Sequence, residues 1–565
     1  MRLSFLNQEV VNVHAAALVL GAAGLASRLV GVVRNRLLFA EFGAGRELDI
    51  YYAAFQIPDF MAAVFLLGAA SAAILPLFQE YLLKEKKKAQ EFIGALSSLF
   101  FLGALAASLT AFFVAPAVIP LAAPGFSADE QALTVALTRI MLFSPVLFGL
   151  SGIFSVVVQS YQLFFVYALA PILYNLGIVL GIVWLVPLFG VHGLGMGVIL
   201  GAAAHSALQF GAAASRGFHF GAVRAPGPGV RRVLLLSFPR VLAMSLTQLT
   251  MMALVAIGSL LEHGSVAVFS AAQDLYFVPI GVFGVSYAVA VFPRMARSAA
   301  QGAGADFFAE LAAGIRGILF WVAPAATLTI VLRAHIVRAA LGAGAFSWED
   351  TRLTAAVLAS LAVAMAAGAV QTLLIRAFYA LGKTWLPLGV SVATSLFSIG
   401  LAWVLTSLLA PSGRAAGSAF GREVAALFRL GDLPHPEVLG LGIGFAAGII
   451  ANVIVLWIFL LRSGAAQFGV RSERQQAALG KIVIAAVLAG IAAYVVRVSF
   501  SETVPLITFT RVVGQGAAAA GAGMGVYWAA LAWLGSEDAA AMRRAAARRL
   551  FSIGVLPREW DGELK

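Results

Sequence analysis

The sequence predicts an all-α polytopic membrane protein with about 14 transmembrane helices, in two pseudo-symmetric six-helix lobes followed by two C-terminal helices. Three observations predict this fold class: an extreme apolar composition, a series of long apolar runs, and an internal repeat. Of the 565 residues, 61% are hydrophobic and 11% are charged, whereas soluble proteins carry about 25% charged residues. Such a chain cannot cover a water-facing surface with polar groups, so its solvent is lipid.

Charged and Pro/Gly-rich breaks divide the chain into candidate spans of the length that a membrane requires, about 20 apolar residues. The runs do not alternate between apolar and polar residues over about 10 positions, as the strands of a membrane barrel do. The predicted spans are 12–34, 50–79, 92–121, 131–159, 163–187, 190–214, 233–260, 265–292, 307–333, 352–379, 385–409, 437–461, 479–499 and 509–534.

The distribution of Lys and Arg predicts that both termini are cytoplasmic. Even-numbered connections between spans are rich in basic residues, as in the run from Lys86 to Lys88, and the tail is basic. We interpret the first residues as a short cytoplasmic lead into the first span, because no small-residue cleavage site follows them. Some arginines of odd-numbered connections run against the trend: Arg333, Arg338, Arg414, Arg422 and Arg429.

An internal repeat divides the chain into halves of six spans. Residues 52–81 resemble 268–297, residues 159–171 resemble 375–387, and HGLGMG (192–197) resembles LGLGIG (439–444), in the same order. Transporters are often built from such repeats, with a central site between them and alternating access.

This repeat gives the expected domain organisation. An N-lobe covers residues 1–225, a C-lobe 226–465, a two-helix unit 466–536 and a basic cytoplasmic tail 537–565. A polar insertion at 411–436 lengthens the C-lobe, and we expect an exposed loop there with a short helix around Arg422 to Arg429.

The first span ends in GLASRLVGVVRNRLLFAEFG (24–43), which carries Arg28, Arg34 and Arg36. An arginine at the centre of a spanning helix costs about 2.5–3.5 kcal/mol, so such residues usually face a bundle interior or an aqueous cavity. The alternative for Arg34 and Arg36 is that they reach the lipid headgroups. Arg28 lies deeper, about 9 Å along the axis from Arg34. A cavity lined by arginine prefers an anion, because guanidinium binds phosphate oxygens bidentately.

Other polar residues lie within or at the ends of the predicted spans. We expect hydrogen bonds between helices for most of the Gln and Asn side chains. Asp49 is expected to pair with an arginine, and Arg240 is a candidate partner of Asp274. The residues are Asp49, Gln56, Asp59, Asn175, Arg240, Gln248, Gln273, Asp274, Arg376 and Asn452.

Several functional classes have no support in the sequence. There is no cysteine, and no Walker motif. The seven histidines are scattered without the spacing of a metal site or a triad. The net charge of +12 resides in short loops and does not form a nucleic-acid-binding pattern. We therefore expect no enzyme, no catalytic residue, no cofactor, no metal and no nucleic-acid partner.

The segment SRLVGVVRNRLLFAEFGAGRELDIYYAAFQIPDF (27–60) resembles the N-terminal signature of the MurJ/MviN family, lipid II flippases of the MOP exporter superfamily. GAASAAILPLF (68–78), LAPILYN (169–175), PRVLAMSLTQ (239–248) and FYALGKTWLP (378–387) resemble later family blocks. The resemblance implies inward/outward alternation, a cationic N-lobe cavity for the pyrophosphate and sugars of lipid II, and a groove for the polyprenyl tail at the last two helices.

The resemblance also implies site residues, since Arg28, Arg34 and Asp49 match family positions of functional importance. The expected headgroup site comprises Arg28, Arg34, Asp49, Arg36, Arg240, Gln56 and Asp274. The chain departs from the family at charged positions, which are here Asn35, Met61, Ala62, Ala63, Leu67 and Asp274. The acidic residues of a family sodium site have no match, so the coupling ion is unknown and coupling to the membrane potential stays open.

The expected function is translocation of an undecaprenyl-pyrophosphate-linked peptidoglycan precursor across the bacterial cytoplasmic membrane. The partners implied are the lipid substrate, the bilayer and cell-wall synthesis proteins. Two alternatives stay open: a flippase for another polyprenyl-linked oligosaccharide of a surface polysaccharide, and a non-transporting membrane scaffold.

Overall fold

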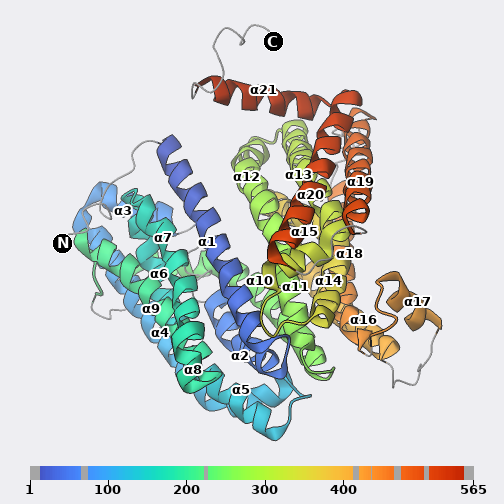
Figure 1. Cartoon of the computed structure of the whole chain (residues 1–565). Coiled ribbons are helices and arrows are strands. Elements are labelled where there is room, and N and C mark those ends of the chain that lie inside the picture. Colours follow the sequence, from blue (N-terminus) through green and yellow to red (C-terminus); the bar gives the residue numbers. More distant parts are fainter. Residues whose placement is uncertain are drawn as a thin grey trace. The chain divides into compact units, whose positions relative to one another are not determined.

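A computed structural model describes residues 13–64, 74–221, 227–410, 419–433, 435–462, 473–501 and 508–552. Within these ranges every regular element is a helix, which confirms the all-α class (Figure 1). Nine of the described helices are long and apolar enough to cross a membrane, or up to eleven if each bent pair counts as one span. The chain is thus a multi-pass membrane protein, while the number fourteen stays a prediction.

Within the described residues, each predicted span overlaps one helix of the structure or a few consecutive helices. In the first half these are α1 (Val13–Phe42), α2 (Arg46–Ala62), α3 (Ile74–Lys84), α4 (Lys86–Ala122), α5 (Ala128–Met141), α6 (Phe143–Ser160), α7 (Phe164–Leu180), α8 (Val186–Phe189) and α9 (His192–Ser215). A π-helical turn, Gly181–Leu185, joins α7 to α8.

The second half continues in the same way. Its helices are α10 (Pro228–Ser259), α11 (Ser265–Pro279), α12 (Val285–Ala300), α13 (Gly304–Leu341), α14 (Trp348–Val363), α15 (Met365–Ala380), α16 (Trp385–Leu409), α17 (Ala419–Leu427), α18 (Leu439–Arg462), α19 (Glu473–Ser501), α20 (Phe509–Trp533) and α21 (Glu537–Ser552). A second π-helical turn, Ile280–Gly284, joins α11 to α12, and a short 3-10 helix, Pro436–Val438, precedes α18. The basic tail beyond 552 lies outside the described residues.

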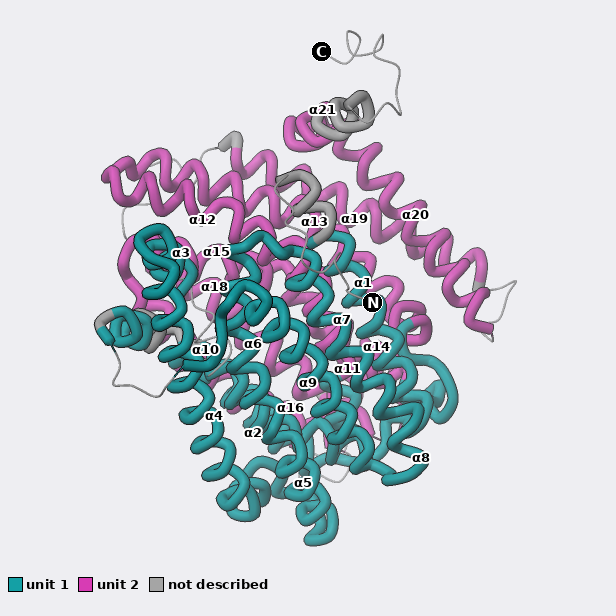
Figure 2. Tube along the Cα trace, turned by 90° about the vertical axis from the view of Figure 1, so that its left-hand side faces the viewer, with its two compact units in different colours: residues 1–270, 340–350 teal, residues 271–339, 351–565 magenta. Residues whose placement is uncertain are grey.

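The chain forms two compact units (Figure 2). Unit 1 contains Met1–Ser270 and Ala340–Asp350, and unit 2 contains Ala271–Ala339 and Thr351–Lys565. The lobe boundaries expected from the repeat lie at 225 and 465 and describe internal symmetry. The division into compact units does not test that symmetry. The lobe boundaries stay predictions.

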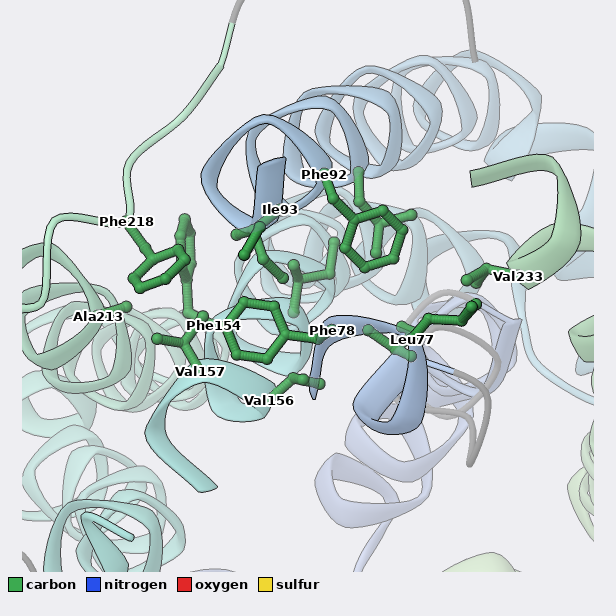
Figure 3. Close-up of a cluster of buried hydrophobic side chains, with 14 of the residues drawn as sticks. Leu77, Phe78, Phe92, Ile93, Phe154, Val156, Val157, Ala213, Phe218 and Val233 are labelled. Carbon is green, nitrogen blue, oxygen red and sulfur yellow. The ribbon is translucent and has the colours of Figure 1, made fainter. Parts of the chain in front are cut away.

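Unit 1 contains an aromatic core between α3, α4, α6 and the segment that follows α9 (Figure 3). Phe78 and Phe218 meet edge to face with ring centroids 5.3 Å apart, and Phe154 lies in the same cluster at 1% exposure. Such ring pairs stabilise by about 0.5–1.5 kcal/mol beyond burial itself. The cluster therefore fixes the ends of these helices to one another.

Helices α7 and α9 approach each other through glycine. A Cβ atom on Gly177 would stand 2.2 Å from Cα of Gly201, and one on Gly181 would stand 2.6 Å from Cα of Gly197. The glycines are four residues apart on both helices, the spacing that lets two membrane helices bring their backbones into contact. The sequence of this pair therefore selects backbone-to-backbone packing.

The same arrangement recurs in unit 2 between α16 and α18. A Cβ atom on Gly444 would stand 2.6 Å from that of Ala402, and one on Gly448 would stand 2.5 Å from that of Ser398. Gly197 and Gly444 are the last glycines of the two motifs that predicted the repeat. Both are therefore contact glycines of their helices, while the repeat itself stays a prediction.

The insertion at 411–436 is described at 419–433 and 435–436, and some of its apolar side chains there are buried. The expected short helix is α17, and Ala425 and Leu430 are buried against the ends of α16 and α18. Arg352 forms an ion pair with Asp432 and holds the pKa of that carboxyl at about 2. Because a lowered pKa stabilises only the ionised form, this tie is present at neutral pH and is lost as the pH falls towards 2. Residues 411–418 and 434 lie outside the described ranges.

We expect Gly177→Ala to lower the free energy of unfolding by about 1–3 kcal/mol, since the added methyl group forces α7 and α9 apart. The matched control is Gly211→Ala on α9, where a Cβ atom meets nothing within 4 Å. The control is expected to be neutral or slightly stabilising, because alanine favours the helix by about 1 kcal/mol. Thermal unfolding of the detergent-solubilised protein compares the two, and equal stabilities contradict backbone contact at Gly177.

Candidate functional site

The guanidinium group of Arg34 in α1 is held by two side-chain amides. Its Nε and Nη2 donate to Oδ1 of Asn35 at 3.0 and 2.8 Å, and its Nη1 donates to Oδ1 of Asn175 in α7 at 3.0 Å. A carboxamide oxygen accepts hydrogen bonds without carrying a charge. These two partners therefore orient the guanidinium group of Arg34.

Asn175 is itself fixed, so that its oxygen faces Arg34. Its Nδ2 donates to the carbonyl oxygen of Pro171 at 3.1 Å and lies 3.5 Å from Oγ of Ser27. The neighbouring Tyr174 lies within electrostatic reach of both Arg34 and Asp59. Helices α1, α2 and α7 thus bring polar groups together that are far apart in the sequence.

Asn175 and Asp59 stand out in the sequence as polar residues, but the predicted site contains neither. The signal that a sequence offers is an amide or a carboxylate within an apolar run. It does not tell which arginine that residue meets, because the contact spans 141 positions of the chain.

Arg36 is bonded to the backbone of its own unit. Its Nη2 donates to the carbonyl oxygen of Gly342 at 3.0 Å, and the nearby N–H of Ala345 donates to the carbonyl oxygen of Ala40 at 2.8 Å. The structure therefore shows a tie between the end of α1 and the segment after α13. Arg28 is exposed on α1.

Asp49 is fully buried and accepts two backbone hydrogen bonds. Its Oδ2 accepts from the N–H of Gly264 at 2.7 Å and its Oδ1 from the N–H of Ala267 at 2.9 Å. These amides belong to the start of α11, where a helix presents unpaired N–H groups and favours negative charge. The expected pairing with an arginine is confirmed, but the partner is Arg46, with Nη1 3.6 Å from Oδ2.

Arg46 extends this contact to α5. Its Nε lies 3.0 Å from Oε1 of Glu130, and its guanidinium carbon lies 4.9 Å from the ring centroid of Phe126. Glu130 also closes a capping box with Ser127 at the start of α5. We call Arg46, Asp49, Glu130 and the backbone of 264–267 the Asp49 junction.

Glycine is required at this junction. Gly264 has a φ of +86°, and a Cβ atom there would stand 1.8 Å from the carbonyl oxygen of Ala44. Since no side chain fits, the chain can deliver the N–H of residue 264 to Asp49 only through glycine.

The remaining predicted site residues are dispersed. Gln56 donates to the carbonyl oxygen of Tyr52 in its own helix, so the bond shown is not the expected bond between helices. Asp274 is exposed on α11. The side chain of Arg240 and all of Leu67 lie outside the described part of the chain, so the pairing of Arg240 with Asp274 stays a prediction.

Hydrogen bonding between helices is confirmed for Asn452 in unit 2. Its Oδ1 accepts from Nε2 of Gln371 at 2.8 Å, and its Nδ2 donates to Oγ1 of Thr394 at 2.9 Å. This network ties α15, α16 and α18 together.

A cleft of about 640 Å³ lies elsewhere in unit 1, along α4 and the connection from α9 to α10. Lys88 and His219 are among its lining residues, and no member of the expected headgroup site lines it. Among the described residues, no group of three or more His, Asp and Glu side chains is arranged to hold a metal ion.

Asp49→Ala is expected to lower the free energy of unfolding by about 2–5 kcal/mol, because two buried N–H groups lose their acceptor and Arg46 loses a counter-charge. Asp49→Asn should cost less, since its single oxygen can still accept. Glu47→Ala, an exposed carboxylate in the same helical turn, is the control with little expected change. Denaturation of the purified variants compares their free energies of unfolding. An Asp49→Ala variant as stable as Glu47→Ala contradicts the role of the junction.

The family model described as "Lipid II flippase MurJ" matches residues 39–514 of this chain. The match begins after Arg28, Arg34 and Arg36, so it does not bear on their role. Similar curated proteins include the probable lipid II flippase MurJ of Rhizobium tropici, 29% identical over 71% of this chain and 77% of its own length. The probable lipid II flippase MurJ of Thermotoga maritima is 27% identical over 76% and 88%.

Solved structures share the fold. The inward closed conformation of a lipid II flippase MurJ superposes with a TM-score of 0.68 at 21% identity, covering 91% of this chain and 99% of that one. Multidrug-resistance MATE transporters of the MOP superfamily match in an inward-facing form (TM-score 0.61, 15% identity, 79% and 96% covered) and an outward-facing form (0.56, 15%, 83% and 99%).

Proposed function

This chain belongs to the lipid II flippase MurJ family, a family of transporters and not of enzymes, and we propose that it translocates lipid II. The substrate would be the undecaprenyl-pyrophosphate-linked precursor of peptidoglycan, moved from the inner to the outer leaflet of the cytoplasmic membrane. The expected orientation, with both termini in the cytoplasm, is part of this proposal.

The observation that carries the proposal is the orientation of Arg34 by the side chains of Asn35 and Asn175. A pyrophosphate group needs a cation whose N–H donors are already aimed, because ordering a long side chain at binding reduces the affinity. Asn35 and Asn175 supply that order through carboxamide oxygens. Arg28 lies on the same helix and is exposed, so it is accessible to a second part of the headgroup.

We infer that the Asp49 junction is one of the contacts that the transport cycle makes and breaks. Asp49 lies in the first predicted half of the repeat, and Gly264 and Ala267 lie in the second. Alternating access by rocking requires that such contacts between the halves separate. A carboxylate and two N–H groups suit this role, since water replaces their hydrogen bonds when they part.

A second candidate is a flippase for another polyprenyl-linked oligosaccharide. At the end of α2, where the family resemblance implies charged positions, the chain has Met61 and Ala63, whose side chains are 5% and 3% exposed. A headgroup site without those charges would recognise the pyrophosphate similarly but the sugars differently. The pyrophosphate step is the same in both candidates.

Complementation tests the proposal in cells depleted of their own lipid II flippase. We expect growth to be rescued by the native chain and not by Arg28→Gln/Arg34→Gln. Loss of two charge-assisted contacts lowers the affinity for the headgroup by roughly 100-fold or more. Arg543→Gln/Arg544→Gln, which removes two exposed arginines of α21, is the matched control and should rescue growth.

Rescue by every variant at equal membrane levels would retain lipid II as substrate and contradict the role of the arginines. Failure of the native chain, with rescue of a strain that lacks a surface-polysaccharide flippase, would favour the second candidate.

A further inference from the structure

Unit 2 contains a group of arginines that the proposed function does not use. Arg333 lies in α13, eight residues before its end, Arg497 lies near the end of α19, and Arg429 lies two residues after α17. Arg333 and Arg429 are among the residues that run against the Lys/Arg trend, in connections expected on the outer side. We call these three residues the arginine cluster.

Two members of the cluster are held on α13. Nη1 of Arg497 donates to the carbonyl oxygen of Val331 at 3.1 Å, and Nη1 of Arg333 donates to that of Ile330 at 3.2 Å. The guanidinium carbon of Arg497 lies 4.9 Å from the ring centroid of Tyr494. A guanidinium group has five N–H donors. Each of these two carbonyl oxygens engages one N–H donor of its arginine.

The third member is fixed by the polar insertion. Arg352 donates to the carbonyl oxygen of Arg429 and to the carboxylate of Asp432. Arg429 has a φ of +60°, and Leu430 beside it is 1% exposed. The insertion therefore holds the backbone of Arg429 at one place on unit 2.

The charges of the cluster act on one another. Arg333 is repelled by Arg497 and Arg429, and Arg497 by Arg429. The nearby carboxylate of Asp432 is engaged by Arg352. In the described part of the chain, no carboxylate forms an ion pair with a member of the cluster. Arg333 and Arg497 are partly buried and Arg429 is exposed, and like charges within reach of one another are unfavourable unless an anion joins them.

The surroundings of the cluster favour an anion that carries apolar chains. On α19, Tyr494 and Phe500 lie three residues to either side of Arg497, on the same face of the helix, and their side chains are 45% and 40% exposed. In a membrane protein such a face contacts lipid tails. A ligand with a phosphate group and acyl or prenyl chains satisfies both surfaces at once.

We propose that the arginine cluster binds the phosphate group of a membrane lipid, at a site separate from the headgroup site on α1. The oxygens accept the remaining N–H donors of Arg333, Arg429 and Arg497, and the chains lie along α19. With the expected orientation the site takes lipids of the outer leaflet. The polar insertion then has a role, since it supplies Arg429.

Thermal stabilisation of the purified full-length protein measures this binding, because a ligand of the folded state raises the unfolding temperature. The probes are short-chain phosphatidylglycerol and inorganic phosphate, with short-chain phosphatidylcholine and sodium chloride of equal ionic strength for comparison. We expect phosphatidylglycerol to stabilise the native chain most. Each of Arg333→Gln, Arg429→Gln and Arg497→Gln should weaken its apparent affinity about tenfold.

Arg511→Gln is the matched control, since it removes an exposed arginine near the start of α20 and should change the affinity less than about twofold. Stabilisation by inorganic phosphate alone would assign the cluster to a free anion and overturn the lipid proposal. Equal stabilisation of the native chain and all three variants would overturn the site itself.

Glu502 provides a further test, because it follows Arg497 by five residues and lies outside the described ranges. If Glu502→Gln binds phosphatidylglycerol and the native chain does not, the cluster is neutralised by its own carboxylate and the proposal is wrong. If Glu502→Gln and the native chain bind equally, the lipid is the counter-ion.

Discussion

Lipid as solvent is the constraint on which the rest of this structure depends. A hydrocarbon medium offers no partner for a backbone amide, so spanning segments must form helices, and it penalises a charge unless the protein surrounds it. The arginines of α1 and α2 meet that second condition in different ways. Arg34 is oriented by amides, Arg36 by a backbone carbonyl, and Arg46 by carboxylates at the Asp49 junction.

The same solvent explains how the helices adhere. Since lipid tails are as apolar as leucine, burial of apolar side chains gives little preference for a protein partner over lipid, and close van der Waals contact takes its place. Gly177 with Gly201, and Gly444 with Ala402, provide that contact in the two units. Polar ties such as the Asp49 junction then differ in kind from the glycine contacts, because water can replace them. A transporter can keep the first kind intact through its cycle and open the second.

Much of the fold could be predicted from the sequence, because apolar length and the Pro/Gly breaks act locally. The helix positions follow from them. The two glycine motifs, at 192–197 and 439–444, are likewise visible in the sequence. The site was harder to predict from the sequence. Asp49 signals an ion pair but not its burial against the amides of Gly264 and Ala267, which lie 215 and 218 positions away. The fold of the insertion onto α16 and α18 depends on single side chains such as Leu430, and no periodic pattern marks them.

The claim that Arg34 holds the anionic headgroup is tested most directly by transbilayer movement of a fluorescent undecaprenyl-pyrophosphate-linked lipid in vesicles that contain the purified protein. The account predicts rapid movement with the native chain, a slower rate with Arg34→Lys, which keeps the charge but lacks the planar fork, and a rate at least about tenfold lower with Arg34→Gln. Equal rates for the three proteins, at equal amounts in the vesicles, would contradict it.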